Sequence, residues 1–63
     1  MLMAMVRIDK ETKERELVWT PDMNEINPEE EIEAALNYYD DVVIRTEDGI
    51  TGEKYHIVFE LVG

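Results

Sequence analysis

The chain has 63 residues, with 16 acids against 6 Lys and Arg and a formal net charge of −10 at pH 7. This length allows one small domain, residues 1–63, which has too little chain to enclose a deep pocket. The absence of Cys excludes disulfides and thiolate metal sites, and the acidic field disfavours direct nucleic-acid binding because it repels phosphates.

The apolar stretches of the chain are all short. The run at the start, residues 1–6, is followed closely by Arg7 and Asp9 and falls well below the roughly 18 residues of a membrane span. It also lacks the basic residues that open a secretory signal. We therefore expect a cytoplasmic protein that does not bind membranes.

The first third of the chain predicts a β-hairpin. Residues 2–9 and 15–20 both alternate with the period-two pattern of strands. The residues between them are polar and turn-prone, and Pro21 ends the second strand because it cannot donate to a β-ladder.

The middle of the chain predicts an amphipathic helix. Asn27 is a favourable N-cap, Pro28 takes the first helical position, and Glu30 falls at N3, where a capping carboxylate belongs. The buried face would consist of apolar residues at i, i+3, i+4 and i+7: Ile32, Ala35, Leu36 and Tyr39. No Gly and no base follows them, and Asp40 and Asp41 oppose the helix dipole, so we expect these two acids to serve binding rather than stability.

Two more strands are predicted, at residues 42–46 and 54–62. A turn opens at Glu47–Gly49, and Gly52 falls within the same connection. The order is therefore ββαββ. The predicted fold class is α+β, a four-stranded, mainly antiparallel sheet with one helix packed on one face.

The alternation of the strands divides the apolar residues into two sets. The larger set is expected to face the helix and comprises Leu2, Ala4, Val6, Ile8, Leu17, Trp19, Val42, Ile44, Tyr55, Ile57, Phe59 and Leu61. The opposite face would carry Met3, Met5, Val18, Val43 and Val58. Because one helix cannot cover both faces, this second set is either a partly hydrated sheet face or a surface for a partner or a second copy of the chain.

The negative charge is concentrated in residues 22–41, whereas residues 1–21 are neutral overall. This segment has no base and eight acids: Asp22, Glu25, Glu29, Glu30, Glu31, Glu33, Asp40 and Asp41. A solvated helix face that keeps the protein soluble is one interpretation. The sharper one is that these carboxylates replace backbone phosphates in the basic groove of a partner protein. The residues that would then bind the partner are Glu29, Glu30, Glu33, Asn37, Tyr38, Asp40 and Asp41.

A small acidic α+β domain with this charge layout is similar in kind to phage-encoded inhibitors, such as anti-CRISPR and DNA-mimic proteins. The similarity is one of composition, and no specific motif carries it. It implies a stoichiometric inhibitor of a basic nucleic-acid-binding protein.

Catalysis is not expected. The chain has no Ser and no Cys, and its single histidine, His56, has no obvious nucleophile beside it. The segment from Asp22 to Glu33 departs from a calcium-binding loop where a ligand and the turn glycine belong, and no Gly-rich phosphate loop is present. We predict no catalytic residue, no cofactor and no metal site.

Two other hypotheses fit the same sequence. The absence of Ser, Gln and Cys and the well-formed helix start suit a de novo designed or engineered mini-protein, either a binder or a scaffold. A homodimeric structural or regulatory subunit would instead pair through Met3, Met5 and Val58.

Overall fold

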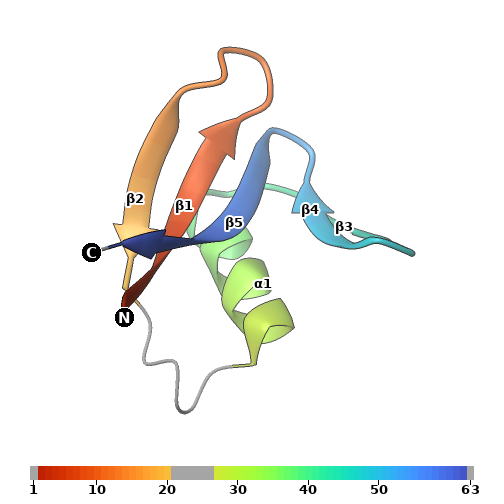
Figure 1. Ribbon diagram of the computed structural model, residues 1–63. Coiled ribbons are helices and arrows are strands. Elements are labelled where there is room, and N and C mark those ends of the chain that lie inside the picture. Colours follow the sequence, from red (N-terminus) through yellow and green to blue (C-terminus); the bar gives the residue numbers. More distant parts are fainter. Residues whose placement is uncertain (1, 21–26, 63) are drawn as a thin grey trace.

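The computed structural model describes residues 2–20 and 27–62. These ranges form one helix and five strands (Figure 1). In chain order the elements are β1 (Leu2–Asp9), β2 (Arg15–Trp19), α1 (Pro28–Tyr38), β3 (Val43–Thr46), β4 (Gly49–Gly52) and β5 (Tyr55–Val62).

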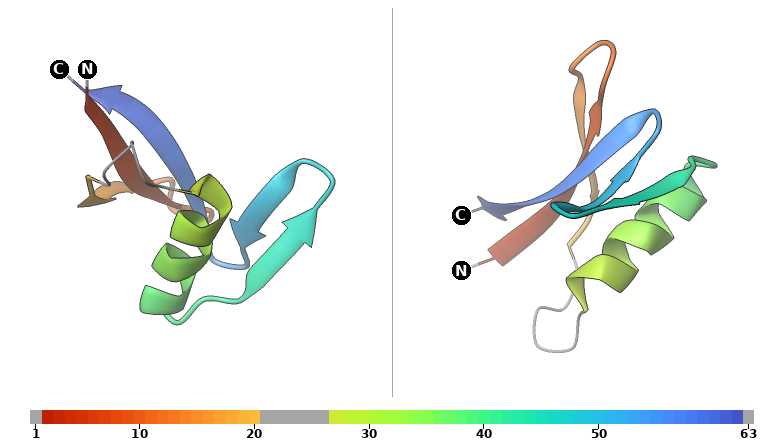
Figure 2. Two further views of the ribbon diagram at one scale, coloured as in Figure 1. Left: turned by 90° about the horizontal axis from the view of Figure 1, so that it is seen from below. Right: turned by 90° about the vertical axis from the view of Figure 1, so that its right-hand side faces the viewer.

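The strands form two antiparallel sheets. One has three strands in the order β2-β1-β5, and the other is the β3-β4 hairpin. The α+β class is therefore confirmed, but the prediction of a single four-stranded sheet is wrong. Figure 2 shows the hairpin diverging from the larger sheet, with α1 packed against strands of both.

The strand that the sequence prediction missed is β4. Its sequence is Gly-Ile-Thr-Gly, and it pairs with β3 from Val43↔Gly52 to Thr46↔Gly49. Glycine weakens a strand and usually marks a turn, so the glycines at both ends of this four-residue segment predicted a turn and not a strand. The turn itself contains Glu47 and Asp48 only.

The hydrophobic core lies where α1 meets β1 and β5. Met5, Ala35, Leu36 and Ile57 are buried, and the first three of them have no exposed surface. The partly buried residues packed around them are Val18, Trp19, Ile32, Val43, Ile50, Tyr55 and Phe59. The apolar stripe predicted for the helix is thus confirmed for Ala35 and Leu36.

The predicted orientation of β1 is wrong. Met5 lies opposite Phe59 of β5, and Arg7 lies opposite Ile57, so the odd-numbered residues of β1 face α1. The alternation could not decide this, because both sides of β1 carry apolar residues. Met5 was predicted on the open face, and it is instead the central core residue of the strand.

Three further residues predicted in the core lie at the surface. Leu17, Val42 and Leu61 are 60%, 56% and 63% exposed. The ladder between β1 and β2 shifts register between Met5 and Val6, and this irregularity breaks the period-two pattern that placed Leu17 inside. The orientation of β3 is also the reverse of the prediction, since Val43 packs against the core and Ile44 is exposed.

The face of the three-stranded sheet opposite α1 is not an open apolar surface. Ala4 and Val6 are buried there. An ion pair between Arg15 of β2 and Glu60 of β5 joins the two outer strands and crosses the central strand on this face. Long charged side chains can cover apolar atoms with their aliphatic parts.

Both ends of α1 are capped. The Asn27 side chain accepts a hydrogen bond from the N–H of Glu29 at 3.1 Å. At the other end, Asp40 has a φ of 55°, and its N–H donates to the Asn37 carbonyl at 3.1 Å. The Asp41 N–H donates to the Leu36 carbonyl at 2.9 Å, which completes a Schellman motif with aspartate in the left-handed position. The expectation of an uncapped helix end is therefore wrong.

Candidate interaction surface

Exposed acids occur over much of the described surface, and α1 with the residues that follow it carries one group of them. Glu29, Glu30, Asn37, Tyr38 and Asp40 are all exposed. We call these five residues, together with Glu33, the acidic helix surface. Two acids of the predicted segment, Asp22 and Glu25, lie outside the described residues.

Two acids of α1 have partners within the fold. The Glu31 Oε2 accepts a hydrogen bond from the Trp19 Nε1 at 3.1 Å. Glu33 pairs with Arg45 of β3 at 2.6 Å, and both side chains are about half exposed, at 41% and 58%. An exposed pair of this kind contributes at most about 1 kcal/mol. Glu31 and Glu33 therefore make contacts within the fold in addition to any contact with a partner.

Asp41 is a structural residue. It is 7% exposed, and its carboxylate accepts hydrogen bonds from the N–H groups of Lys54 at 3.0 and 3.1 Å, of Tyr55 at 3.0 Å and of Val42 at 2.8 Å. These contacts connect the end of α1 to the start of β5. The placement of Asp41 on the binding surface is therefore corrected, because its carboxylate faces the interior.

Gly52 makes room for this carboxylate. A Cβ atom at Gly52 would lie 2.0 Å from Oδ2 of Asp41 and 2.6 Å from Cδ2 of Leu36. Glycine is needed here for close approach, since a side chain would displace Asp41 from the β4–β5 connection.

The hydrogen bonds also set the protonation state of Asp41. Burial alone would raise its pKa, but the N–H donors of Lys54, Tyr55 and Val42, together with the charge of Lys54, outweigh burial and lower the pKa below its ordinary value. Asp9 at the end of β1 shows the same effect at the surface, where the N–H groups of Thr12 and Glu11 lower its pKa. Both acids are ionised at neutral pH.

Among the described residues, Arg45 is the one base with an ion pair to the acidic helix surface, through Glu33. All three arginines pair with glutamates, as Arg7–Glu16, Arg15–Glu60 and Arg45–Glu33. The three lysines lie near the β1–β2 turn: Lys10 and Lys13 within it, and Lys54 beside it, where its carbonyl accepts the Lys10 N–H at 3.0 Å. Figure 1 shows this turn at the end of the molecule opposite the start of α1. Residues 10–14 contain two lysines and two glutamates, so the turn is neutral overall, whereas α1 has four acids and no base.

The predicted apolar sheet surface is not assembled. Met5 is in the core, and Val18 and Val43 pack against the core from different sheets. Met3 and Val58 are partly buried. Odd-numbered and even-numbered residues of β1 and β5 lie on opposite faces of the three-stranded sheet, so Met3 and Val58 do not share a face. These five residues do not form one surface for a dimer partner.

A cluster of aromatic rings beside the helix was not predicted from the sequence. The Arg7 guanidinium lies 4.4 Å from the ring centroids of both Tyr39 and Tyr55. Burial, followed by the charge of Glu16, raises the pKa of Tyr39. Tyr38 contacts Tyr39 edge to face, with centroids 5.0 Å apart. The pairing of β1 with β5 and the packing of α1 against β5 together bring these residues into contact, so no local pattern could reveal the cluster.

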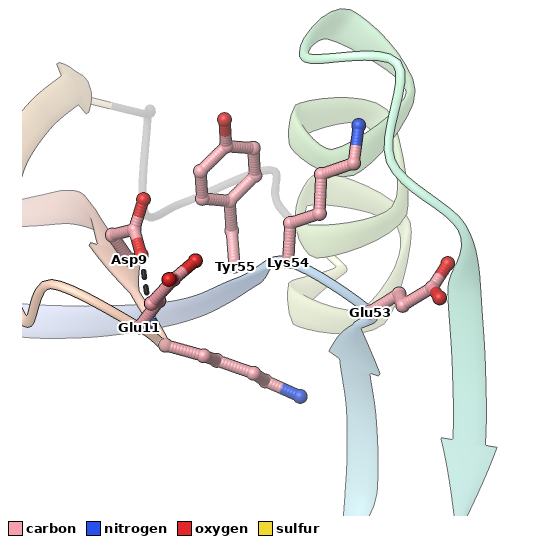
Figure 3. A pocket seen from close by; sticks show the side chains of 6 residues that line it. Asp9, Glu11, Glu53, Lys54 and Tyr55 are labelled. Carbon is pink, nitrogen blue, oxygen red and sulfur yellow. Dashed lines mark hydrogen bonds between the residues drawn. The ribbon is translucent and has the colours of Figure 1, made fainter.

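Two shallow hollows flank the β1–β2 turn. One is lined by acids, lysines and Tyr55. Figure 3 shows Asp9, one of these acids, turned toward the backbone of Glu11. The other contains His56, whose Nδ1 lies 3.4 Å from the Thr51 Oγ1. The sequence did not predict this contact between His56 and Thr51. The contact is long and exposed, and the same hydroxyl is 3.5 Å from the Tyr55 carbonyl, so the histidine does not activate it.

No group of three or more His, Asp or Glu side chains suited to a metal ion occurs within residues 2–20 and 27–62. In the same ranges, no helix has the length and apolar character needed to cross a bilayer. A scan against family models found no match, and neither did searches of curated proteins and of solved structures.

Proposed function

We propose that this protein is a non-catalytic binding module that inhibits a basic nucleic-acid-binding protein by occupying its nucleic-acid site. The acidic helix surface would make the contact, with its carboxylates in place of backbone phosphates. The observation that carries the proposal is that α1 has four acids and no base of its own. Every arginine is paired with a glutamate and every lysine lies near the β1–β2 turn, so the exposed carboxylates of α1 have no base beside them except Arg45.

The rigidity of the helix supports this role. α1 is capped at both ends and is anchored through Leu36 and Asp41, so its exposed carboxylates are held in place before a partner arrives. Preorganised charges lose less entropy on binding than charges on a mobile segment. They also attract a basic partner at long range, which speeds association at low salt.

The test is capture of basic nucleic-acid-binding proteins from a cell lysate on the immobilised protein. One variant, called the α1 variant, removes three charges from the acidic helix surface: Glu29→Gln, Glu30→Gln and Asp40→Asn. A matched control removes three charges outside this surface, in the β3–β4 turn and the β4–β5 connection: Glu47→Gln, Asp48→Asn and Glu53→Gln. Captured proteins should be released by high salt and by added double-stranded DNA, and the α1 variant should lose them while the control retains them.

Two results would contradict the proposal. One is equal capture by both variants, which would mean that net charge rather than the acidic helix surface determines binding. The other is capture that persists in high salt and in the presence of DNA, since a phosphate mimic must compete with nucleic acid.

A further inference from the structure

An exposed aromatic pair adjoins the acidic helix surface. Tyr38 is 72% exposed, and its ring meets the Trp19 ring at an interplanar angle of 88° with centroids 6.5 Å apart. The Trp19 indole is fixed by its hydrogen bond to Glu31. We call Trp19, Glu31 and Tyr38 the aromatic–acidic patch.

The fold already shows what such a combination binds. Around Arg7, the rings of Tyr39 and Tyr55 and the carboxylate of Glu16 hold one guanidinium. The aromatic–acidic patch has the same parts, two rings and a carboxylate. Within the described part of the chain, the cation–aromatic contacts are those of Arg7, and neither Trp19 nor Tyr38 receives one.

Charge complementarity selects the occupant. Tyr38 is mostly exposed, and Glu30 and Glu31 lie on the same helix. A carboxylate has acceptor capacity for several hydrogen bonds, so Glu31 can receive a further donor while it holds Trp19. An anionic or purely apolar partner group would leave these acids unsatisfied.

We infer that the aromatic–acidic patch binds an arginine side chain of the partner, with the guanidinium stacked on Tyr38 and hydrogen-bonded to Glu31. This inference rests on the proposed function, because it names the group through which a basic partner makes its specific contact. Arginine suits the patch better than lysine, since its planar guanidinium both stacks on rings and donates in a fork to carboxylates. Arginine, tyrosine and tryptophan are also the residues most enriched at binding hot spots.

The experiment uses two peptide probes of equal length and charge, hexa-arginine and hexa-lysine. The sequence contains a single tryptophan, so the fluorescence of Trp19 reports directly on the patch. Backbone amide NMR shifts report on the whole acidic helix surface. At low salt we expect both peptides to bind, the arginine peptide about threefold more tightly and with a larger change in Trp19 emission.

Two substitutions of Tyr38 separate stacking from general attraction. Tyr38→Leu keeps apolar bulk but removes the ring, so it should abolish the preference for arginine and leave the affinity for hexa-lysine unchanged. Tyr38→Phe keeps the ring and should retain the preference. Because Tyr38 is mostly exposed, both variants should unfold at the temperature of the parent protein, which thermal denaturation checks.

The outcomes distinguish this inference from the proposed function. Equal binding of both peptides with no change at Trp19 overturns the arginine site and leaves the acidic helix surface standing. A preference for arginine that does not weaken with salt supports the patch and contradicts the electrostatic mechanism. If neither peptide binds at low salt, both proposals are wrong.

Discussion

Asp41 is a single residue that connects the end of α1 to the start of β5. It ends the acidic segment in the sequence, yet its carboxylate binds three backbone N–H groups in the interior. Its neighbour Asp40 is exposed and takes part in the helix end through its backbone. Two adjacent residues of the same type thus have different roles, and substitutions can separate them.

The first prediction concerns Asp41→Asn. An amide keeps one acceptor oxygen but turns N–H donors toward the backbone donors of Lys54, Tyr55 or Val42. We expect the free energy of unfolding to fall by about 1–3 kcal/mol, the cost of leaving buried polar groups without partners. Chemical denaturation of this variant, with Asp40→Asn as the matched control, measures the difference. A loss of the same size in the control would contradict a specific role for Asp41.

The second prediction is the pH dependence of the same contribution. The pKa of Asp41 is lowered in the folded state, so its contribution to stability is complete above the ordinary aspartate pKa of about 3.9 and is lost as the pH falls through the lowered folded value. The stability difference between the parent and Asp41→Asn should therefore be full at neutral pH and shrink progressively at acidic pH, as the pH falls through the lowered folded pKa. Thermal or chemical unfolding at neutral pH and across the acidic range tests this. A difference that stays constant would show that Asp41 acts through packing rather than charge.

For the elements, the ends of α1 show what local sequence determines. The helix start was predicted correctly because Asn27 and Pro28 act on their own neighbours. The C-terminal cap was missed because the left-handed position is held by Asp40 rather than by glycine. The cost of that conformation is compensated by tertiary contacts of the next residue, which the sequence does not display.

The third prediction follows from that conformation. Asp40→Gly should raise the free energy of unfolding by about 0.5–1 kcal/mol, since glycine adopts a positive φ without strain and a negative charge leaves the C-terminal end of the helix. Asp40→Ala is the matched control, because it removes the same charge but keeps the Cβ atom. If both variants gain equally, the helix dipole rather than backbone strain explains the effect.

The strands show the limit of pattern-based prediction. β5 was oriented correctly because Tyr55, Ile57 and Phe59 outweigh the other side of the strand. β1 has apolar residues on both sides, so its orientation depends on the pairing with β5 and not on its own sequence. The candidate surface shows the same difference between residues predicted from local pattern and residues whose position depends on tertiary contacts. The exposed positions of α1 were predictable from helical periodicity, whereas the burial of Asp41 and the pairing of Glu31 with Trp19 depend on contacts between distant segments.

For the whole molecule, the net charge of −10 on 63 residues opposes compaction through self-repulsion. The three arginine–glutamate pairs act in the opposite sense, but each has at least one side chain that is more than half exposed, so each contributes little. The balance between these effects can be measured without knowing the partner.

The fourth prediction is that salt stabilises the protein. Raising the ionic strength from about 0.01 to 0.2 M shortens the screening length to below the size of the domain, so repulsion between distant acids weakens. We expect the unfolding temperature to rise by about 3 °C, equivalent to about half a kcal/mol for a domain of this size. A series of thermal scans at increasing sodium chloride concentration tests this. A fall in the unfolding temperature would mean that the ion pairs outweigh the repulsion.

The pairing of β1 with β5 has a consequence for the time course of folding. Leu2 lies opposite Val62, so the central strand of the larger sheet is made before both of its partners, and β5 is made after all the other elements described. A growing chain on the ribosome can form the β1–β2 hairpin early, but the core around Met5 must wait until β5 has emerged. Since contacts between distant segments slow folding, this domain should fold slowly for its length and mainly after its synthesis is complete.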